Sequence, residues 1–355
     1  IALEAARESI TLLKNEKNVL PFAKNKKVLV IGPNGNSLTA LNGAWSYTWQ
    51  GQKPTYFSKE ERTISDAMKI KIGNENVSYQ GWYSSTIVPK AKEEVNPFVG
   101  DYILMCIGEG AYAETPGNIN NLDLPSSVTA EIQDIKNNYK GIPLIILLTE
   151  GRPRIIREIE PLADAIILAY WPGSQGGNAI ADVLYGDYNP CGKLPFTYPK
   201  YSGDILTYDH KLLDEAVEVP DPYSYTYKFD PQWPFGFGLR YTTFEYSDLK
   251  LSNTTLKGND KLKVSVTVKN TGKVAGKETV ELYSRDLYAS VTPSVKRLRA
   301  FKKIYLEAGA AQTVEFEISR EDLAFVNAEM KWVTEPGGFE LMVGPLKAAF
   351  SYTDK

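Results

Sequence analysis

The sequence predicts an α/β domain followed by an immunoglobulin-like β-sandwich. In the first half, near-continuous apolar runs alternate with helical patterns, which is typical of parallel sheets covered on both faces. From about residue 241, short runs of alternating apolar and polar residues take over, separated by turn signals such as Asn270-Thr271-Gly272. The length of 355 residues suffices for two such domains, and 43% hydrophobic residues is an ordinary globular value.

The first domain contains five candidate strands with helical patterns between them. The apolar runs cover residues 28–31, a weaker run near Val77, and residues 102–107, 144–148 and 165–169. The helical patterns cover a run over residues 3–13, a run from Ser58 with Glu61 at capping-box spacing, and about residues 127–139 and 177–184. Because strands and helices alternate, we expect parallel βαβ units with right-handed crossovers.

The second half changes character twice. Residues 191–240 are rich in Pro, Gly, Tyr and Asp and have little periodicity, so we expect an irregular connection there. Strands are then expected over residues 262–268, 279–284, 314–318 and 339–343. Roughly seven short strands over about 115 residues are typical of an immunoglobulin-like sandwich.

Composition excludes several classes of function. The net charge of −3 argues against a nucleic-acid partner or an anionic membrane, and no apolar run approaches the ~20 residues of a membrane helix. Cys106 and Cys191 match no metal-ligand spacing, and no other cluster of metal-binding residues is evident. A single histidine, His210, argues against Ser-His-Asp or Cys-His chemistry. We therefore expect neither a metal nor a cofactor.

A loop with two carboxylates follows the apolar run 102–107. It covers residues 108–118 and contains Glu109, Tyr112 and Glu114. Ligands of open α/β sheets bind at the carboxyl ends of strands, where a carboxylic acid can serve as a general acid. Two solvated glutamates are the ordinary alternative, but Tyr112 and the Thr115-Pro116-Gly117 turn favour Glu114 as the acid. Glu109 is expected to belong to the strand end and to orient the loop.

Two other loops supply candidate binding residues. Trp45, Tyr47 and Trp49 form either a loop anchored by its aromatic rings or a platform for the apolar faces of sugars, and a nearby acid favours the platform. Arg152, which follows the run 144–148, either pairs with a loop carboxylate or lies on a surface turn. The glycine-rich residues 32–36 lack both nucleotide-binding fingerprints, so nucleotide binding is a remote alternative.

Several long motifs occur in a characteristic order along the whole chain. They are Ala5-Ala6-Arg7-Glu8-Ser9-Ile10-Thr11-Leu12-Leu13-Lys14-Asn15, Gly151-Arg152-Pro153, and residues 171–184, 186–195, 234–244 and 296–303. Together they resemble the C-terminal part of family 3 glycoside hydrolases, the β-glucosidase and glucan exohydrolase family.

The resemblance implies a flavodoxin-like α/β sandwich domain followed by a fibronectin-III-like β-sandwich, with the family's N-terminal (β/α)8 barrel absent from this chain. The implied boundaries are residues 1–20 for a linker and a helix leading in from the barrel, 21–199 for the α/β domain, 200–240 for the connection and 241–355 for the β-sandwich. Because the chain starts at Ile1 without a signal sequence, we expect a fragment or a processed product of a secreted or periplasmic protein.

The resemblance also implies site residues. Glu114 falls where the glucan-exohydrolase branch carries its acid/base glutamate, and Trp45 and Trp49 fall on its paired entrance tryptophans. Tyr112 is an expected substrate-binding residue, and Glu109 and Arg152 are expected to support the site. Cys191 stands where a small hydroxyl or alanine is usual, and Pro116 and Asn118 vary the loop after the acid; none of these departures touches the role of Glu114.

The implied function is that of a retaining, exo-acting β-glucosidase that hydrolyses terminal β-D-glucosyl residues. Its nucleophilic aspartate would lie on the barrel, so this chain alone should be inactive. The alternatives are β-xylosidase specificity and a noncatalytic carbohydrate-binding or scaffold fragment. The expected partners are a β-glucoside or β-glucan oligosaccharide and the barrel, as a domain or a second chain, and a homodimer is compatible with the sequence.

Overall fold

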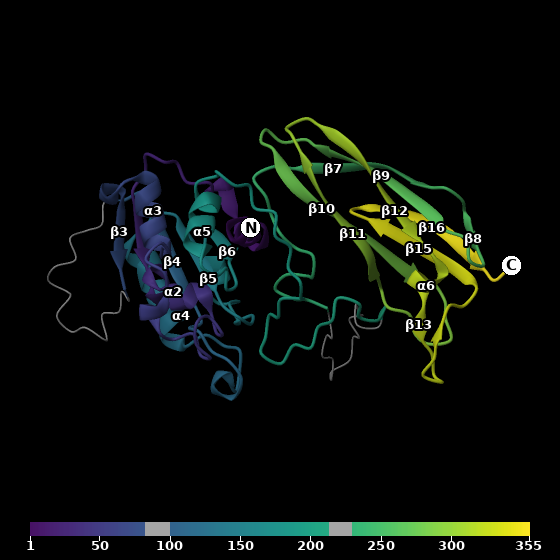
Figure 1. Cartoon of the computed structure of the whole chain (residues 1–355), viewed down its shortest axis with the longest axis horizontal. Helices are drawn as coiled ribbons and strands as arrows, with labels where there is room; N and C mark the ends of the chain where they lie inside the picture. The colour runs from purple at the N-terminus through teal and green to yellow at the C-terminus, as the bar shows by residue number, and fades with distance from the viewer. Residues whose placement is uncertain (82–99, 213–228) are drawn as a thin grey trace, which may run out of the picture. The chain divides into compact units, whose positions relative to one another are not determined.

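A computed structural model describes residues 1–81, 100–212 and 229–355 and divides the chain into two compact units (Figure 1). The α/β unit contains Ile1–Asp204 and Gly236–Tyr241, and the β-sandwich unit contains Ile205–Phe235 and Thr242–Lys355. The expected connection 200–240 is thus divided between the units. Residues 236–241 belong to the first unit because Leu194 N donates to Phe237 O (2.9 Å), and Leu239 N donates to Leu12 O (2.7 Å).

The α/β unit is built on one six-stranded sheet. Its strands are β1 (Thr11–Asn15), β2 (Val28–Ile31), β3 (Val77–Gln80), β4 (Tyr102–Gly108), β5 (Leu144–Thr149) and β6 (Ala165–Leu168). They lie in the order β1-β6-β5-β4-β2-β3, with β2 to β6 parallel and β1 antiparallel to β6. The five parallel strands alone follow the flavodoxin-like order. The predicted fold class of this half is confirmed.

The start of the chain differs from the expected helix over residues 3–13. Helix α1 (Ala2–Ser9) ends early, and β1 begins at Thr11 and pairs with β6, Thr11 opposite Leu168. Thr11, Leu12 and Leu13 are all buried. Three consecutive buried residues suit a sheet strand, and the pairing with β6 overrides the helical pattern.

The helix expected from Ser58 also begins later. Helix α3 covers Ile64–Ile72, and the Thr63 side chain accepts a hydrogen bond from Asp66 N as the N-cap. Ser58 N does donate to Glu61 Oε1 (3.1 Å), but this pair closes a turn before the helix. The Glu61 carboxylate is also held by Asn42 and Tyr47, which fixes it away from a capping role.

Helices and short 3-10 turns complete the α/β unit. The other α-helices are α2 (Leu38–Asn42), α4 (Ser126–Asn138) and α5 (Gly176–Leu184), and the 3-10 helices are η1 (Glu16–Asn18), η2 (Pro33–Asn36), η3 (Pro54–Tyr56), η4 (Asn74–Asn76), η6 (Thr115–Gly117) and η7 (Glu160–Leu162). Figure 1 labels α2, α3, α4 and α5 among the strands of this unit. Helix α5 packs against α1 and α3. Its Asp182 accepts from Arg7 Nε (2.8 Å) and pairs with Lys71, which joins the three helices by charge.

The β-sandwich unit consists of two antiparallel layers and a small hairpin. One sheet has the order β12-β9-β7 and the other β11-β10-β15-β16-β8, where only β8 and β16 are parallel. The strands are β7 (Phe244–Leu251), β8 (Thr255–Lys257), β9 (Leu262–Asn270), β10 (Gly276–Asp286), β11 (Arg297–Leu306), β12 (Ala311–Ile318), β15 (Gly337–Val343) and β16 (Leu346–Thr353), with the hairpin strands β13 (Phe325–Val326) and β14 (Trp332–Val333) after helix α6 (Arg320–Leu323). Alternate residues of β9, including Val264, Val266 and Val268, are buried in the core between the layers. The predicted sandwich is confirmed.

Candidate active site

The loops that follow β2, β4 and β5 meet at the carboxyl edge of the α/β sheet. The strand order reverses between β2 and β4, and ligands of open α/β sheets bind at such a switch point. Gly108 ends β4 with φ +133°, and a Cβ there would lie 2.1 Å from Thr149 O of the neighbouring strand. This close approach places the loop that starts at Glu109 directly against the loop that starts at Glu150.

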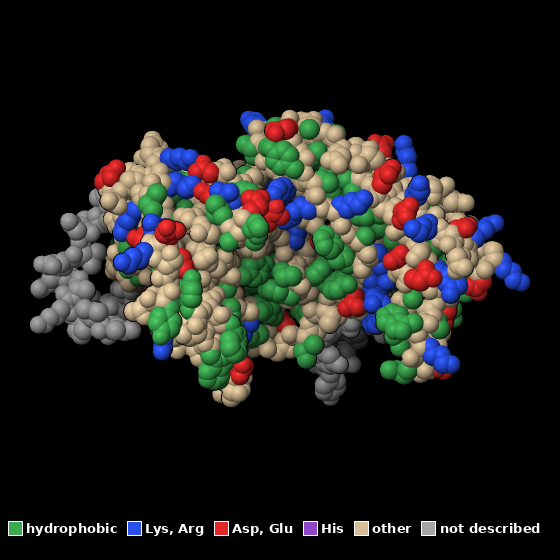
Figure 2. All heavy atoms as spheres, viewed as in Figure 1, with side chains coloured by type: hydrophobic (Ala, Val, Ile, Leu, Met, Phe, Trp, Pro, Cys, Tyr) green, Lys and Arg blue, Asp and Glu red, His purple; other side chains and the backbone are tan. Residues whose placement is uncertain are grey.

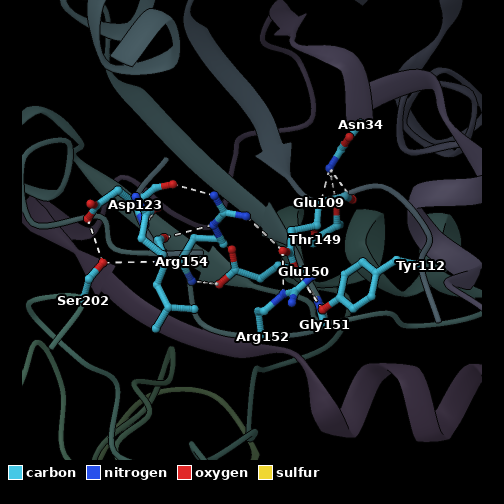
Figure 3. A network of polar contacts seen from close by, with 12 residues as sticks. Asn34, Glu109, Tyr112, Asp123, Thr149, Glu150, Gly151, Arg152, Arg154 and Ser202 are labelled. Carbon is cyan, nitrogen blue, oxygen red and sulfur yellow. Dashed lines mark hydrogen bonds and ion pairs between the residues drawn. The ribbon is translucent and has the colours of Figure 1, made fainter. Parts of the chain in front are cut away.

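Glu109 is the buried centre of a polar network (Figure 3). Its Oε1 accepts hydrogen bonds from Arg152 Nε (2.9 Å) and Arg154 Nη1 (3.0 Å). Its Oε2 accepts from the Tyr112 hydroxyl (2.9 Å) and from Gly151 N (3.3 Å). Both carboxylate oxygens are therefore engaged within the protein, and Glu109 fastens the β4 loop to the β5 loop.

Tyr112 is packed from several sides. The Arg152 guanidinium lies 4.0 Å from the centre of the Tyr112 ring, and Trp171 meets the ring edge-on at 4.8 Å. A Cβ on Gly117 would lie 2.4 Å from the ring, so the turn after Glu114 packs closely against it. Burial, together with the hydrogen bond to Glu109, raises the pKa of the Tyr112 hydroxyl well above its usual value. The hydroxyl therefore stays protonated and donates to Glu109.

Asn34 connects the glycine-rich turn after β2 to the same network. Its Nδ2 donates to Thr149 Oγ1 (2.6 Å) and to Glu109 O (3.4 Å), as Figure 3 shows. Asn34 and Thr149 are both buried. The glycine-rich turn therefore positions Asn34, which joins the loops after β2, β4 and β5 at this edge. This structural role explains the turn without a bound phosphate.

Glu150 is a second buried carboxyl group, next to Glu109. Its Oε1 lies 3.0 Å from the Tyr198 hydroxyl, which also lies 2.7 Å from Arg154 O. Burial raises the pKa of Glu150 to about 8, so the group is protonated at neutral pH. One hydroxyl hydrogen cannot serve both acceptors, and a proton on Glu150 resolves this, because Tyr198 then donates to Arg154 O and accepts from Glu150.

Sequence reasoning missed three members of this network, Asn34, Glu150 and Arg154. A usable signal existed, because all three follow apolar strand runs, as Glu109 and Arg152 do. Arg154 Nε also donates to Leu122 O (3.0 Å), which holds the far end of the β4 loop. Spacing alone could not show that two arginines share one carboxylate.

Glu114 differs from Glu109 in every structural respect. Its side chain is exposed and makes no hydrogen bond or ion pair with any residue in the described ranges. Its backbone has φ 54° and ψ −144°, a conformation that favours glycine, and the Glu114 carbonyl accepts from Gly117 N (2.8 Å). Residues other than glycine in such conformations cost roughly 1–3 kcal/mol and cluster at functional sites.

The aromatic loop after α2 is fastened beside Glu114. Gln50 Nε2 donates to Ala113 O (3.0 Å), and Ala113 N donates to Gln50 Oε1 (3.0 Å). Trp49 and Glu114 are the chain neighbours of this bonded pair, so they lie in adjacent loop segments. The side chains of Trp45 and Trp49 are 69% and 46% exposed.

The rest of this aromatic loop is held by Tyr47. The Tyr47 hydroxyl donates to Glu61 Oε1 (3.2 Å), and its ring meets Phe57 edge-on at 5.5 Å. Trp45 N donates to Trp49 O (3.0 Å), which closes the loop. Tyr47 therefore anchors the segment and leaves the two tryptophan rings available for contact.

Other candidate chemistry is not evident in the described ranges. They contain no group of three or more His, Cys, Asp or Glu residues able to hold a metal ion. His210 belongs to the β-sandwich unit, where its ring stacks on Phe229 at 3.8 Å. Both cysteines are buried free thiols. None of the helices described here combines the length and apolar character needed to cross a bilayer.

Comparison with known families matches both units. The glycosyl hydrolase family 3 C-terminal domain matches residues 10–241, and the fibronectin type III-like domain matches residues 278–346. A periplasmic β-glucosidase of Salmonella typhimurium is 35% identical over 97% of this chain and 48% of its own length. A lysosomal β-glucosidase of Dictyostelium discoideum is 36% identical over 97% of this chain and 43% of its own length.

Other similar proteins include one named a β-xylosidase and a β-glucosidase of known structure. A β-xylosidase of Formosa agariphila is 35% identical over 97% of this chain and 48% of its own length. The crystal structure of a β-glucosidase from Listeria innocua in complex with isofagomine superposes with a TM-score of 0.86 at 28% identity, over 99% of this chain and 49% of that one. The chain spans about half the length of the curated relatives it matches.

Proposed function

The chain belongs to glycoside hydrolase family 3, as its C-terminal part, and we propose that it supplies the general acid/base of a retaining, exo-acting β-glucosidase. Glu114 is the proposed acid/base. Trp45 and Trp49 are the proposed walls of the subsites for the leaving sugar. The proposal concerns hydrolysis of terminal β-D-glucosyl residues by the protein when a barrel that carries the nucleophile is present.

One observation supports the choice of Glu114 over its neighbours. It is an exposed carboxyl group in a strained backbone conformation at the switch-point edge of the sheet, beside two exposed tryptophans. Glu109 accepts hydrogen bonds from two arginines and a tyrosine, and the Glu150 side chain is buried. Neither can approach a sugar without losing its partners.

The proposed chemistry requires Glu114 to act twice. First it protonates the departing glycosidic oxygen while a nucleophilic carboxylate forms the glycosyl-enzyme. It then takes a proton from the water that hydrolyses this intermediate. A retaining enzyme also needs a nucleophilic carboxyl group ~5–5.5 Å from the acid/base. Glu109 is held by two arginines and Glu150 is buried, so we place the nucleophile outside the Glu109–Arg154 network. The family resemblance assigns it to the N-terminal barrel.

The remaining predicted residues take supporting parts in this proposal. Arg152 pairs with Glu109 and covers the Tyr112 ring, so these three residues hold the loop that carries Glu114. Tyr112 was expected to contact substrate. Because its hydroxyl donates to Glu109, only the half-buried ring could contribute to such a contact, and we assign Tyr112 a mainly positioning role.

The test is the dependence of the Glu114→Ala variant on the leaving group, measured in the protein joined to its barrel. A good leaving group needs no protonation, so kcat/KM, which reports formation of the glycosyl-enzyme, should fall far less for an aryl glucoside with an acidic phenol than for a disaccharide. Loss of the general base should lower kcat for the aryl glucoside, because hydrolysis of the glycosyl-enzyme becomes slow. Azide, which attacks without general-base help, should restore turnover of the activated substrate and yield a β-glucosyl azide.

The matched control is Glu75→Gln, at an exposed glutamate of η4 just before β3, which should retain full activity on both substrates. An equal loss on both substrates in Glu114→Ala, without azide rescue, would show that Glu114 is not the acid/base.

A second candidate is β-xylosidase specificity, because a relative at 35% identity carries that name. Glu114 and the tryptophans would serve either sugar, since they face the leaving group. Comparison of kcat/KM for matched aryl β-glucosides and β-xylosides decides between the two activities. We also propose a secreted or periplasmic location, which is supported by a periplasmic and a lysosomal relative.

A further inference from the structure

We propose that the β-sandwich unit contains a separate binding site for a neutral saccharide, in the cavity between β10, β11 and the β13–β14 hairpin. The cavity has a volume of about 280 Å³, near the lower end of the ~300–1,000 Å³ range of ligand pockets. Its wall includes Asp209, Asp286, Arg297, Arg299, Phe325 and Trp332. All six belong to this unit, so the site does not depend on Glu114 or on the α/β unit.

The floor of the cavity carries two arginines side by side. Arg297 and Arg299 both belong to β11 and both line the cavity, and a β-bulge opposite Leu282 and Tyr283 interrupts the regular alternation of the strand at Arg299. Arg299 Nε donates to Ser284 Oγ (2.7 Å) on β10, which directs the guanidinium. Burial, and the positive charge of Arg297, lower the pKa of Arg299 to about 10. The guanidinium nevertheless remains charged at neutral pH and keeps donors that a ligand could use.

Two acids, Asp209 and Asp286, line the same cavity, and Asp286 attracts Arg299 electrostatically. Asp286, two residues beyond Ser284 on β10, accepts a hydrogen bond from Tyr288 N (3.1 Å), and burial raises the pKa of its carboxyl group. Among the described residues, neither Asp209 nor Asp286 forms an ion pair with Arg297 or Arg299. The cavity therefore presents hydrogen-bond donors and acceptors that are not used up by each other.

Two aromatic residues of the hairpin also line the cavity. Phe325 and Trp332 come from the two strands of the small hairpin, and the Trp332 side chain is 69% exposed. Figure 2 shows hydrophobic and basic side chains next to each other where Figure 1 labels β13. An exposed indole beside charged hydrogen-bonding groups resembles the mixed lining of sites that bind amphipathic ligands.

The combination of charges favours a neutral saccharide over an ion. An anion would face Asp209 and Asp286, and a cation would face Lys211, Arg297 and Arg299, so either would meet like charge. The vicinal hydroxyls of a sugar donate to a carboxylate and accept from a guanidinium at once, and the C–H face of the ring packs on an indole. A glucan chain held here would remain near the enzyme between cleavage events.

Calorimetric titration of the 355-residue chain with cellotetraose and laminaritetraose tests the site. The measurement uses a Trp45→Ala, Trp49→Ala background, which removes the aromatic platform of the proposed active site. Binding should persist in that background and weaken at least about tenfold on adding Trp332→Ala or Asp286→Asn. Because the ligand is neutral, the affinity should change little in about 0.5 M NaCl.

Asp260→Asn, an exposed acid elsewhere in the same unit, is the matched control and should bind as well as the background protein. Circular dichroism of each variant checks that the sandwich is folded. The proposal fails if the background protein binds neither tetrasaccharide, if Trp332→Ala binds as well as its parent, or if salt abolishes the affinity. Failure here would leave the leaving-group test of Glu114 unaffected, since that test concerns the other unit.

Discussion

Glu109 and Glu114 lie on the same loop, but their different surroundings suit them to different roles. Glu109 accepts from four donors, whereas the Glu114 side chain has no partner among the described residues. A buried carboxylate between two guanidiniums is an anchor, because its removal leaves the guanidiniums without a counter-charge. An exposed carboxyl group on an anchored loop is the one that can reach a ligand.

At this scale, Glu109→Ala should destabilise the α/β unit strongly. Breaking a buried pair by removing one partner costs about 3–5 kcal/mol, and here Arg152, Arg154 and Tyr112 would lose their acceptor together. Urea unfolding followed by circular dichroism measures the loss. Glu158→Ala, whose glutamate forms an exposed ion pair with Arg157, should change stability by less than about 1 kcal/mol. Similar small losses in both variants would mean that Glu109 is not an anchor.

Glu150 should make the stability of the α/β unit depend on pH. Burial raises its pKa to about 8 from the ordinary 4.5, so between these values the folded chain holds a proton that the unfolded chain has released. The free energy of unfolding therefore falls as pH rises through this window. Glu150→Gln cannot ionise at this position. Its free energy of unfolding, relative to that of the natural chain, should therefore increase by several kcal/mol, to order of magnitude, between about pH 5 and pH 8.5. Urea midpoints at the two pH values measure this, and a pH-independent difference would contradict it.

Among the elements, the apolar strands of the sheet were predictable because burial on both faces leaves a continuous signal. The runs at 28–31, 102–107, 144–148 and 165–169 correspond to β2, β4, β5 and β6. Strand β1 was not predictable, because its pairing with β6 joins residues far apart in the sequence. The predicted start of α3 at Ser58 was wrong for a related reason, because Glu61 is held by Asn42 and Tyr47 and the N-cap is Thr63. These contacts also join residues that are not neighbours in the sequence.

The site shows the same division between local and nonlocal signals. The loop after β4 and its two glutamates could be read from the sequence, since a polar segment follows a buried strand. The shared use of Glu109 by Arg152 and Arg154, and the clamp of Gln50 on Ala113, could not. Both arise from contacts between separate loops, for which one sequence carries no spacing rule.

The clamp between loops gives a prediction for an element. Gln50→Glu replaces the amide donor by a carboxylate, which would repel Ala113 O, while Gln50→Ala removes both hydrogen bonds. In the protein with its barrel, we expect kcat/KM on a disaccharide to fall about tenfold in both variants, the loss of one to two hydrogen bonds, with little change in thermal stability. Gln52→Ala, which removes a single longer bond to Ala111 O (3.3 Å), should have a smaller effect. Equal effects of all three would refute the clamp.

For the whole molecule, the two units carry different parts of the proposed activity. The α/β unit holds Glu114 and the exposed tryptophans, and the β-sandwich unit holds the separate cavity lined by Arg299 and Trp332. Where the β4 and β5 loops begin, the other carboxyl groups among the described residues are those of Glu109 and Glu150, which are buried, so neither is free to act as a nucleophile beside Glu114. The proposed acid/base is thus one member of a pair.

This incompleteness predicts that the 355-residue chain alone does not hydrolyse aryl β-glucosides. Glu109 is bound by two arginines and Glu150 is buried, so neither can form the glycosyl-enzyme that a retaining mechanism requires. Activity should appear when a family 3 barrel is supplied, by fusion or as a second chain, and should disappear again in the Glu114→Ala fusion with a disaccharide substrate. Release of 4-nitrophenol by the isolated, purified chain above the uncatalysed rate would overturn the prediction, because it would require a nucleophile within residues 1–355.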